Sequence, residues 1–352
     1  MKREPPEWKQ AEQGLSAAAP AGRIGSEISE PRYTKFLDPV SMRILVTVAR
    51  MYYERQITQA QIAQDLHFSQ SRVSRLLKQA QEAGIVEIRV KAPEGFHAEL
   101  ESEVERKYHA RKVVVASTWE TEGGYTLIES LGEAAAAYLP IELSGTQHIG
   151  VSSWSTALHA TVRAMERVSG LSASYVTQLI GGVGVASAQA RATQLVERMA
   201  KVLGADYRML PFPAVLDSAA SRDVMLNEAI VRESVEAWKS VDVALVGIGT
   251  LEPSELLVSS GNTLGEDDAR TLRSIGAVGD VVLRHYDAYG SFVGQDIASR
   301  IIGIGAEDYR RIPVRIGIAG GKAKHRSIRA ALRGGWINVL VTDVGTAEFL
   351  VT

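Results

Sequence analysis

Apolar stretches of strand length alternate with helical patterns over most of this chain, and this alternation limits the possible folds more than any other feature. The strand-like runs are residues 113–115, 148–151, 175–180, 241–246, 314–318 and 337–341. The helical patterns between the early runs are residues 127–139, 156–168 and 188–203. Continuous apolar strands connected by helices are typical of a parallel sheet that is buried on both faces. We therefore predict an α/β domain with a mainly parallel sheet over residues 111–352.

A hydroxyl-rich loop follows the second strand-like run. Ligands of parallel sheets bind beyond the carboxyl ends of the strands, and the residues at this end are Ser152, Ser153, Trp154, Ser155 and Thr156. A helix that begins here would offer an anion its free backbone N–H groups and the positive end of its dipole. The same hydroxyls could also serve only as a helix cap. The sequence leaves both interpretations open.

Three further strand ends are rich in glycine. Their residues are Gln178, Gly181 and Gly182, then Gly247 and Gly249, then Gly320 and Gly321 with Lys322 and Lys324. Glycine allows the backbone to approach a ligand closely, although a tight turn alone also favours it. Four polar or glycine-rich strand ends favour a ligand site over a purely structural or protein-binding module.

Three carboxylates lie close together in sequence after the fourth strand-like run. Asp280, Asp287 and Asp296 could accept hydrogen bonds from sugar hydroxyls, or they could be solvated loop residues. A metal site is a poor alternative, because His285 lies nearby but the spacing matches no known ligand pattern.

Residues 58–84 have the pattern of a helix-turn-helix. Thr58 and Gln61 fit a T-x-x-Q capping box at the first helix, with Ile57 placed as a hydrophobic staple. Ser69 can cap the second helix, and Gly84 is placed to end it. An amphipathic pattern at residues 40–52 supplies a third helix, and residues 85–91 alternate like the strand of a winged variant. The competing interpretation is an ordinary helical hairpin with a solvated face.

The outer face of the second helix is polar and basic, with no acidic residue before Glu82. A recognition helix needs short polar groups to reach base edges and cations to meet phosphates. The residues that we expect to contact DNA are Thr58, Gln59, Ser69, Gln70, Ser71, Arg72, Ser74, Arg75 and Lys78.

The remaining sequence sets the boundaries of the domains. Residues 1–38 are rich in proline, alanine and small polar residues, so we expect a disordered leader before a DNA-binding domain at residues 39–93. Phe96, Leu100, Val104 and Tyr108 recur every four residues and predict a linker helix within residues 94–110, packed on its own domain or on a second subunit.

Composition excludes several classes of function. The absence of cysteine rules out disulfides, thiolate catalysis and cysteine-ligated zinc, and it fits a cytoplasmic protein. The sequence contains no apolar run of the roughly 20 residues that a membrane span needs. The net charge of −2 gives no general support for DNA binding, which therefore rests on Arg72, Arg75 and Lys78 and on binding as an oligomer.

Over residues 39–352 the chain resembles the SorC family of bacterial transcriptional regulators. The resemblance lies in ITQAQIAQDLHFSQSRVSRLLKQAQEAGIVEIRV, GVSSWSTAL, QLIGG, GAVGDVVLRHYDAYG and IAGGKAKHRSIRAALRGGWINVLVTDVGTAEFLV. It implies an N-terminal helix-turn-helix and a C-terminal effector domain related to sugar-phosphate isomerases and the glucosamine-6-phosphate deaminase fold. It also implies a homo-oligomer, tetramer or dimer, that binds operator DNA as a repressor or activator and a sugar, sugar phosphate or polyol as effector.

The resemblance also assigns the effector site. The family lysine falls on Lys324 rather than Lys322. The residues expected at the site are Ser152, Ser153, Trp154, Ser155, Thr156, Gln178, Gly181, Gly182, Gly247, Gly249, Asp280, Asp287 and Lys324. Many relatives that bind sugar phosphates have a W-G-x-T loop, whereas Ser155 follows Trp154 here, so a free sugar or polyol remains possible. We expect no cofactor, metal or catalytic residue.

An enzyme is the main competing hypothesis, as a sugar-phosphate isomerase or deaminase with an extra N-terminal domain. Enzymes that resemble the deaminase place Asp-Gly-His after a Gly-x-Gly segment. Here Gly249 is followed by Thr250, Leu251 and Glu252, so the histidine is missing. Glu252 alone is a poor substitute for a positioned acid/base pair.

Overall fold

The computed structural model describes residues 39–87, 96–117, 126–166 and 171–352. It divides into two compact units, Met1–Lys91 and Ala92–Thr352. The expected leader at residues 1–38 lies outside the described residues, and so do residues 88–91 of the expected wing strand. Residues 85–87 by themselves form no strand. None of the helices in the described ranges has the length and apolar composition that a membrane span requires.

The smaller unit is a three-helix arrangement built on the predicted motif. Its elements are α1 (Pro39–Ala49), a π-helical turn η3 (Arg50–Glu54), α2 (Gln59–Asp65) and α3 (Gln70–Glu82). Val48, Ile62 and Val73, one from each helix, are fully buried against one another. The predicted capping box is only half formed, because Gln61 N donates to Thr58 Oγ1 while the Gln61 amide donates to Asp65 Oδ1.

The larger unit contains a seven-stranded sheet in which every neighbouring pair is parallel, in the order β1-β9-β8-β5-β2-β3-β4. The strands are β1 (Lys112–Ala116), β2 (His148–Val151), β3 (Tyr175–Gln178), β4 (Asp206–Arg208), β5 (Val243–Val246), β8 (Val314–Ile318) and β9 (Val339–Asp343). The predicted α/β class and mainly parallel sheet are therefore confirmed. The short edge strand β4 was not predicted.

Helices cover both faces of this sheet. The helical elements of the larger unit are α4 (Ala98–Tyr108), α5 (Leu127–Glu142), α6 (Thr156–Ala164), α7 (Ala186–Leu203), α8 (Ala219–Leu226), α9 (Ala229–Trp238), α10 (Glu255–Ser260), α11 (Glu266–Ser274), α12 (Gln295–Ala298), α13 (Ala306–Arg311), a 3-10 turn η4 (Lys322–Lys324), α14 (His325–Arg333) and α15 (Val344–Val351). Alternate residues of β5 enter two different cores: Val243 and Leu245 pack with α5, α6 and α7, and Ala244 and Val246 pack with α9 and α14. A strand that is buried on both sides must be apolar throughout, which explains its sequence.

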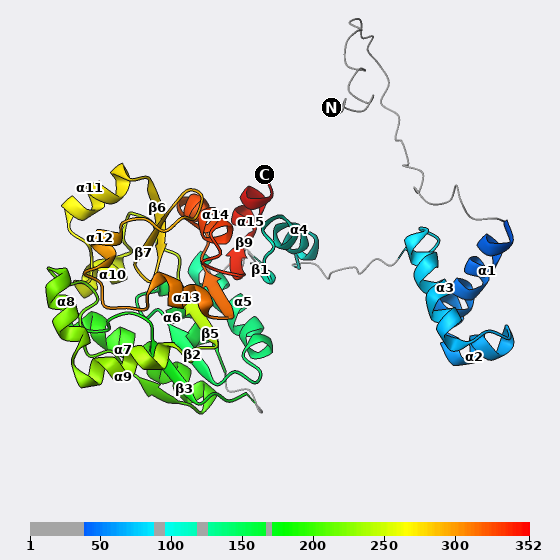
Figure 1. Ribbon diagram of the computed structural model, residues 1–352, viewed down its shortest axis with the longest axis horizontal. Coiled ribbons are helices and arrows are strands. Elements are labelled where there is room, and N and C mark those ends of the chain that lie inside the picture. Colours follow the sequence, from blue (N-terminus) through cyan, green and yellow to red (C-terminus); the bar gives the residue numbers. More distant parts are fainter. Residues whose placement is uncertain (1–38, 88–95, 118–125, 167–170) are drawn as a thin grey trace, which may run out of the picture. The chain divides into compact units, whose positions relative to one another are not determined.

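Helix α4 protects the edge strand β1. Figure 1 shows α4 and α15 side by side, although they are far apart in the sequence. Glu105 Oε1 accepts from Val113 N at 2.9 Å, and Glu101 Oε1 accepts from Val115 N at 2.9 Å. These carboxylates satisfy N–H groups that an edge strand would otherwise expose. Of the predicted apolar stripe, Val104 is buried, but Phe96 is 69% exposed.

An antiparallel hairpin of β6 (Ala277–Val281) and β7 (Arg284–Asp287) lies outside the main sheet. Its turn residues, Val282 and Leu283, have positive φ angles of 49° and 58°. Leu283 N donates to Asp280 Oδ2 at 2.9 Å, which stabilises this turn without glycine. The hairpin was not predicted, and it is the element that carries Asp280.

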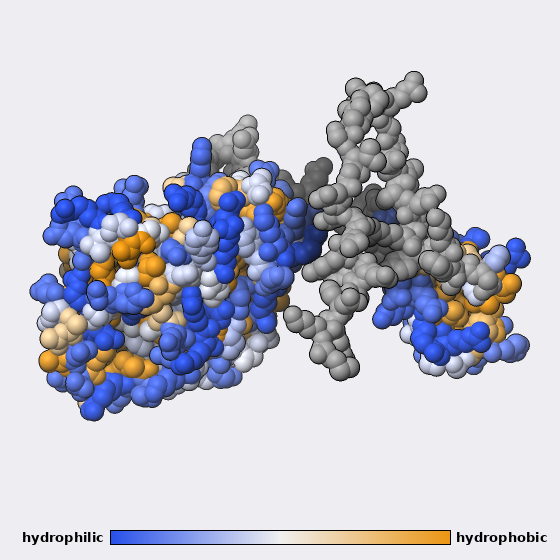
Figure 2. Space-filling view, turned by 45° about the horizontal axis from the view of Figure 1, so that its top comes forward, coloured by the Kyte–Doolittle hydropathy of each residue, from blue (hydrophilic) through white to orange (hydrophobic). Residues whose placement is uncertain are grey.

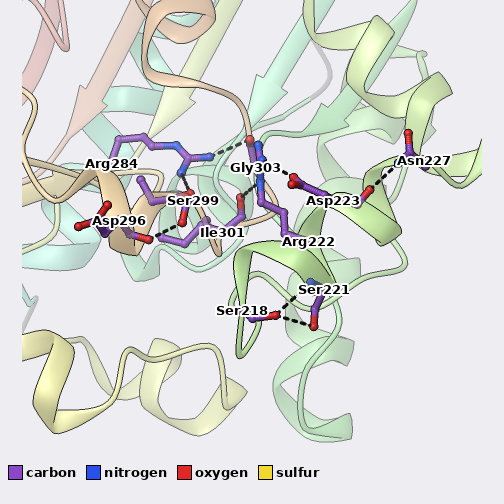
Figure 3. A network of polar contacts seen from close by, with 11 residues as sticks. Ser218, Ser221, Arg222, Asp223, Asn227, Arg284, Asp296, Ser299, Ile301 and Gly303 are labelled. Carbon is purple, nitrogen blue, oxygen red and sulfur yellow. Dashed lines mark hydrogen bonds and ion pairs between the residues drawn. The ribbon is translucent and has the colours of Figure 1, made fainter.

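A buried guanidinium fixes this hairpin to the neighbouring segment (Figure 3). Arg284 is 3% exposed and donates to the carbonyl oxygens of Gly303 and Ile304 at 2.8 Å and of Ala298 at 3.2 Å. Burial, reinforced by the charge of Arg222, lowers the pKa of Arg284 to about 10. Gly303 in turn pairs with Ile180 beyond β3, so this network positions the loops at the carboxyl end of the sheet.

Candidate functional site

A cavity of about 340 Å³ lies at the carboxyl ends of the central strands. It is lined by the loops after β2, β5 and β8 together with the β6–β7 hairpin. The predicted effector-site residues that line it are Ser152, Trp154, Ser155, Thr156, Gly247, Gly249, Asp280 and Lys324. These residues span 173 positions of sequence, and the parallel topology is what brings them to one edge of the sheet.

The loop after β2 leads directly into the first turn of α6. Ser155 is the N-cap residue, and its Oγ accepts from Leu158 N at 3.3 Å. Trp154 is buried, and its Nε1 donates to the Gly181 carbonyl oxygen at 2.9 Å. The loop is thus held from below by the tryptophan. The start of α6, with its first N–H groups and the positive end of its dipole, lies in the cavity wall, an arrangement that is able to attract an anion.

The two glycines after β5 are required by neighbouring side chains of the site. A Cβ on Gly247 would lie 2.6 Å from Ser155 Oγ, and one on Gly249 would lie 1.9 Å from Asp280 Oδ1. Gly249 also exchanges backbone hydrogen bonds with Asp280, at 2.9 and 3.3 Å. The sequence suggested that these glycines let a ligand approach the backbone. In the structure they let the carboxylate and the hydroxyl approach it.

Lys324 provides the cation of the cavity. Its Nζ donates to the Ile248 carbonyl oxygen at 2.7 Å, which leaves two of its three N–H donors for other partners. Burial lowers the pKa of Lys324, and the nearby Asp280 carboxylate partly opposes this effect. The cavity therefore brings together the Lys324 ammonium group, the N-terminus of α6 and the Asp280 carboxylate.

Five of the predicted site residues do not line the cavity. Ser153 and Gln178 are fully buried behind it, where Gln178 Nε2 donates to Ser153 Oγ at 2.9 Å and Gln178 Oε1 accepts from Leu210 N at 2.7 Å. Gly181 accepts the tryptophan N–H, and Gly182 packs against the Gln178 amide. Asp287 Oδ1 instead accepts from Tyr289 N and Ser291 N at 2.9 Å, and thus caps the turn after β7.

Sequence reasoning missed part of the lining. These residues are Ile180, Ile248, Thr250, Glu252, Pro253, Ser254, Leu257, Val282, Leu283 and Ala323. Glu252 is exposed and brings a second carboxylate into the wall. Its position shortly after the Gly-x-Gly segment, in the loop that follows β5, was the available signal, although the sequence suggested only a catalytic role for it. Within the described ranges, no cluster of metal-ligating side chains is present and no histidine lines the cavity.

The smaller unit presents the predicted DNA-contacting residues at its surface. All of them are exposed except Gln59, which is half-buried. Ser69 caps α3 by accepting from Arg72 N at 3.3 Å, and the Arg72 guanidinium lies 4.1 Å from the centre of the Phe68 ring. Lys78 forms a 3.8 Å ion pair with Glu82, and Arg75 Nε donates to the Ser71 carbonyl oxygen at 3.4 Å. The basic face is therefore partly preorganised. Its contact with DNA remains a prediction.

Comparison with known proteins agrees with this architecture. Residues 93–352 match the family described as "Putative sugar-binding domain", and residues 47–83 match sigma-70 region 4. The deoxyribonucleoside regulator of Bacillus subtilis (strain 168) is 32% identical over 90% of this chain and 99% of its own length. The sorbitol operon regulator of Klebsiella pneumoniae is 31% identical over 88% of this chain and 98% of its own.

A solved structure extends the comparison to three dimensions. The crystal structure of the full-length sorbitol operon regulator SorC from Klebsiella pneumoniae has a TM-score of 0.65 and 30% identity, and covers 89% of this chain and 100% of that chain. These relatives are named as regulators, so the competing enzyme hypothesis is not favoured.

Proposed function

Because the chain belongs to the SorC family of transcriptional regulators, we propose that its cavity binds a sugar, sugar phosphate or polyol that controls the binding of α3 to operator DNA. The regulated genes would then serve the catabolism of a carbohydrate or polyol. One observation carries this proposal: Lys324, Asp280 and the N-terminus of α6 meet in a cavity of about 340 Å³.

The chemistry of the cavity suits a polyhydroxylated ligand with at most one phosphate. The first turn of α6 and Lys324 attract an anionic group, whereas Asp280 and Glu252 accept hydrogen bonds from hydroxyls and repel a second phosphate. Ser155 has a side chain where relatives that bind sugar phosphates have a glycine after the tryptophan. A free sugar or polyol is therefore included among the proposed ligands.

DNA binding requires an oligomer in this account. Each smaller unit contributes Arg72, Arg75 and Lys78, and two or four copies would multiply the phosphate contacts that a chain of net charge −2 otherwise lacks. The larger unit has apolar patches on the face shown in Figure 2. Val224 and Ile230 are among its exposed apolar side chains. Such patches are typical of protein–protein contacts, and they support a dimer or tetramer.

The effector would act by shifting the populations of different arrangements of the oligomer. It can favour one arrangement of the oligomer only to the extent that it binds that arrangement more tightly. Helix α4 directly precedes β1 and packs on α15, so it is the element through which a change in the larger unit would reach the DNA-binding unit along the chain.

A thermal-shift screen of the full-length protein tests the proposal. Matched free and phosphorylated sugars and polyols are compared, since a ligand at 100 times its Kd adds about 2.7 kcal/mol to the free energy of unfolding. The proposal predicts stabilisation by one compound or one matched pair, and loss of that stabilisation in Lys324→Met. A hit that stabilises Lys324→Met equally well would place the ligand elsewhere.

A further inference from the structure

A second hollow lies on the outer surface of the helical layer, between α6 and α7. It has a volume of about 730 Å³. Its floor is apolar and consists of Val162, Leu195 and Val202, all of them buried. Its rim is cationic, with Arg163 from α6 and the pair Arg198 and Lys201 from α7.

The cations of this groove are poorly compensated. Within the part of the chain that the structure describes, neither Arg163 nor Lys201 forms an ion pair at contact distance, although the charge of Arg163 contributes to lowering the pKa of Glu129. Glu197 is the one carboxylate among the described lining residues, and its Oε1 already accepts from the Tyr207 hydroxyl at 2.9 Å. The groove therefore holds three positive charges against one negative charge, an imbalance that an anion would correct.

One of the three cations is held in place. Arg198 Nε donates to the Val162 carbonyl oxygen at 2.8 Å, and its Nη2 donates to the Arg163 carbonyl oxygen at 2.9 Å. These bonds satisfy carbonyl groups in the last turn of α6, and they fix the plane of the guanidinium. Among the described residues, no hydrogen bond involves its Nη1 group. A positioned guanidinium loses little conformational freedom when it binds an oxyanion.

His159 lies at the base of the same groove. Its Nε2 is buried and has no hydrogen-bond partner among the described residues. Burial lowers the pKa of His159. A hydrogen bond to the Ser153 backbone opposes this effect, whereas the charges of Arg191 and Arg163 add to it. The imidazole thus connects the groove to the loop after β2, and its NMR signal would report any anion that binds above it.

We propose that the groove between α6 and α7 is a second anion site, which takes the phosphate group of a small metabolite or inorganic phosphate. Phosphate presents several acceptor oxygens in a compact group, which suits a groove that is lined by cationic side chains from two helices. This site is separate from the 340 Å³ cavity and goes beyond the proposed function. The two share α6, since the helix begins at the cavity and its last turns form one wall of the groove.

The test follows the histidine signals of the full-length protein by NMR during titration with inorganic phosphate at constant ionic strength. His159→Gln assigns the His159 signal. We expect this signal to move with a saturable dependence on phosphate, both in the wild type and in Lys324→Met, which disables only the cavity. Arg163→Gln combined with Lys201→Gln should weaken the binding at least about tenfold. Both side chains are exposed, so the double variant should remain folded.

Two further titrations complete the test, one with a control variant and one with a second phosphate compound. Lys239→Gln is the matched control, because Lys239 is an exposed lysine outside the groove that is paired with Glu236, and it should bind phosphate like the wild type. Glycerol 3-phosphate, titrated in parallel, distinguishes a phosphomonoester from inorganic phosphate as the preferred source. The proposal is overturned if no saturable shift occurs, if the double variant binds like the wild type, if Lys324→Met loses the response, or if chloride reproduces it.

Discussion

The fit between Gly249 and Asp280 leads to a quantitative prediction for Gly249→Ala. The added Cβ would lie 1.9 Å from Asp280 Oδ1, whereas ordinary contact begins at 3.4 Å. The carboxylate must therefore move by about 1.5 Å, and this breaks its 2.9 Å hydrogen bond from Leu283 N. Overpacking of this kind costs about 1–3 kcal/mol. We expect Gly249→Ala to lower the free energy of unfolding by that amount.

A double-mutant cycle identifies the cause of that loss. In an Asp280→Ala background the clashing carboxylate is absent, so Gly249→Ala should cost clearly less, with a coupling energy of about 1–2 kcal/mol. Gly265→Ala is the matched control: its Cβ would meet no heavy atom within 4 Å, so whatever it costs at the N-cap of α11 should be the same in both backgrounds. Urea unfolding can be followed by the fluorescence of Trp154, Trp238 and Trp336, which are buried in the larger unit. An equal cost of Gly249→Ala in both backgrounds would refute the reasoning.

Two further predictions concern the Asp343 carboxylate and the cations of α3. The Asp343 carboxylate accepts hydrogen bonds from Gly321 N at 2.7 Å, from Thr346 N at 3.0 Å and from Thr346 Oγ1 at 2.6 Å. Burial raises the pKa of Asp343, but these hydrogen bonds outweigh burial and lower the pKa below the ordinary value of 3.8. The stabilisation is present above pH 3.8 and is lost as the pH falls through the lower folded-state pKa. Asp343→Asn should therefore lower the free energy of unfolding by about 1.5–3 kcal/mol at pH 7. In unfolding measurements below pH 3.8, the difference in this free energy between the variant and the wild type should shrink. A difference that stays constant with pH would contradict this account. Arg72→Ala with Arg75→Ala should abolish sequence-specific DNA retention and reduce the slope of log K against log salt by about 0.9 per lost phosphate contact, and unchanged binding would remove α3 as the recognition helix.

The sequence predicted most elements whose burial follows a simple period. Strand β5 is a continuous apolar run, and α3 has its buried residues at helical spacing, so both were predicted. The β6–β7 hairpin was missed because its turn is Val282–Leu283, without the Asn-Gly or Gly residues that usually signal a tight turn. Its stability depends on Asp280 and on the carbonyl contacts of Arg284, which no local pattern reveals.

The site was predictable in its loops but less so in the roles of individual side chains. Strand ends identified the loops after β2, β5 and β8, because parallel topology brings such ends together. The sequence could not tell that Gln178 turns behind the cavity to bond Ser153, or that Asp287 caps a turn, since both depend on contacts between distant segments. Glu252 also lines the cavity, and its position in the loop after β5 could have indicated this.

The central claim is that a ligand in the cavity controls DNA binding, and one titration tests it most directly. Labelled DNA, selected in vitro by the full-length protein, is titrated with wild type and Lys324→Met, each with and without the compound that stabilises the wild type. We predict that the compound changes the Kd for DNA of the wild type, and that Lys324→Met binds DNA normally but does not respond. An equal response in both proteins would contradict the account.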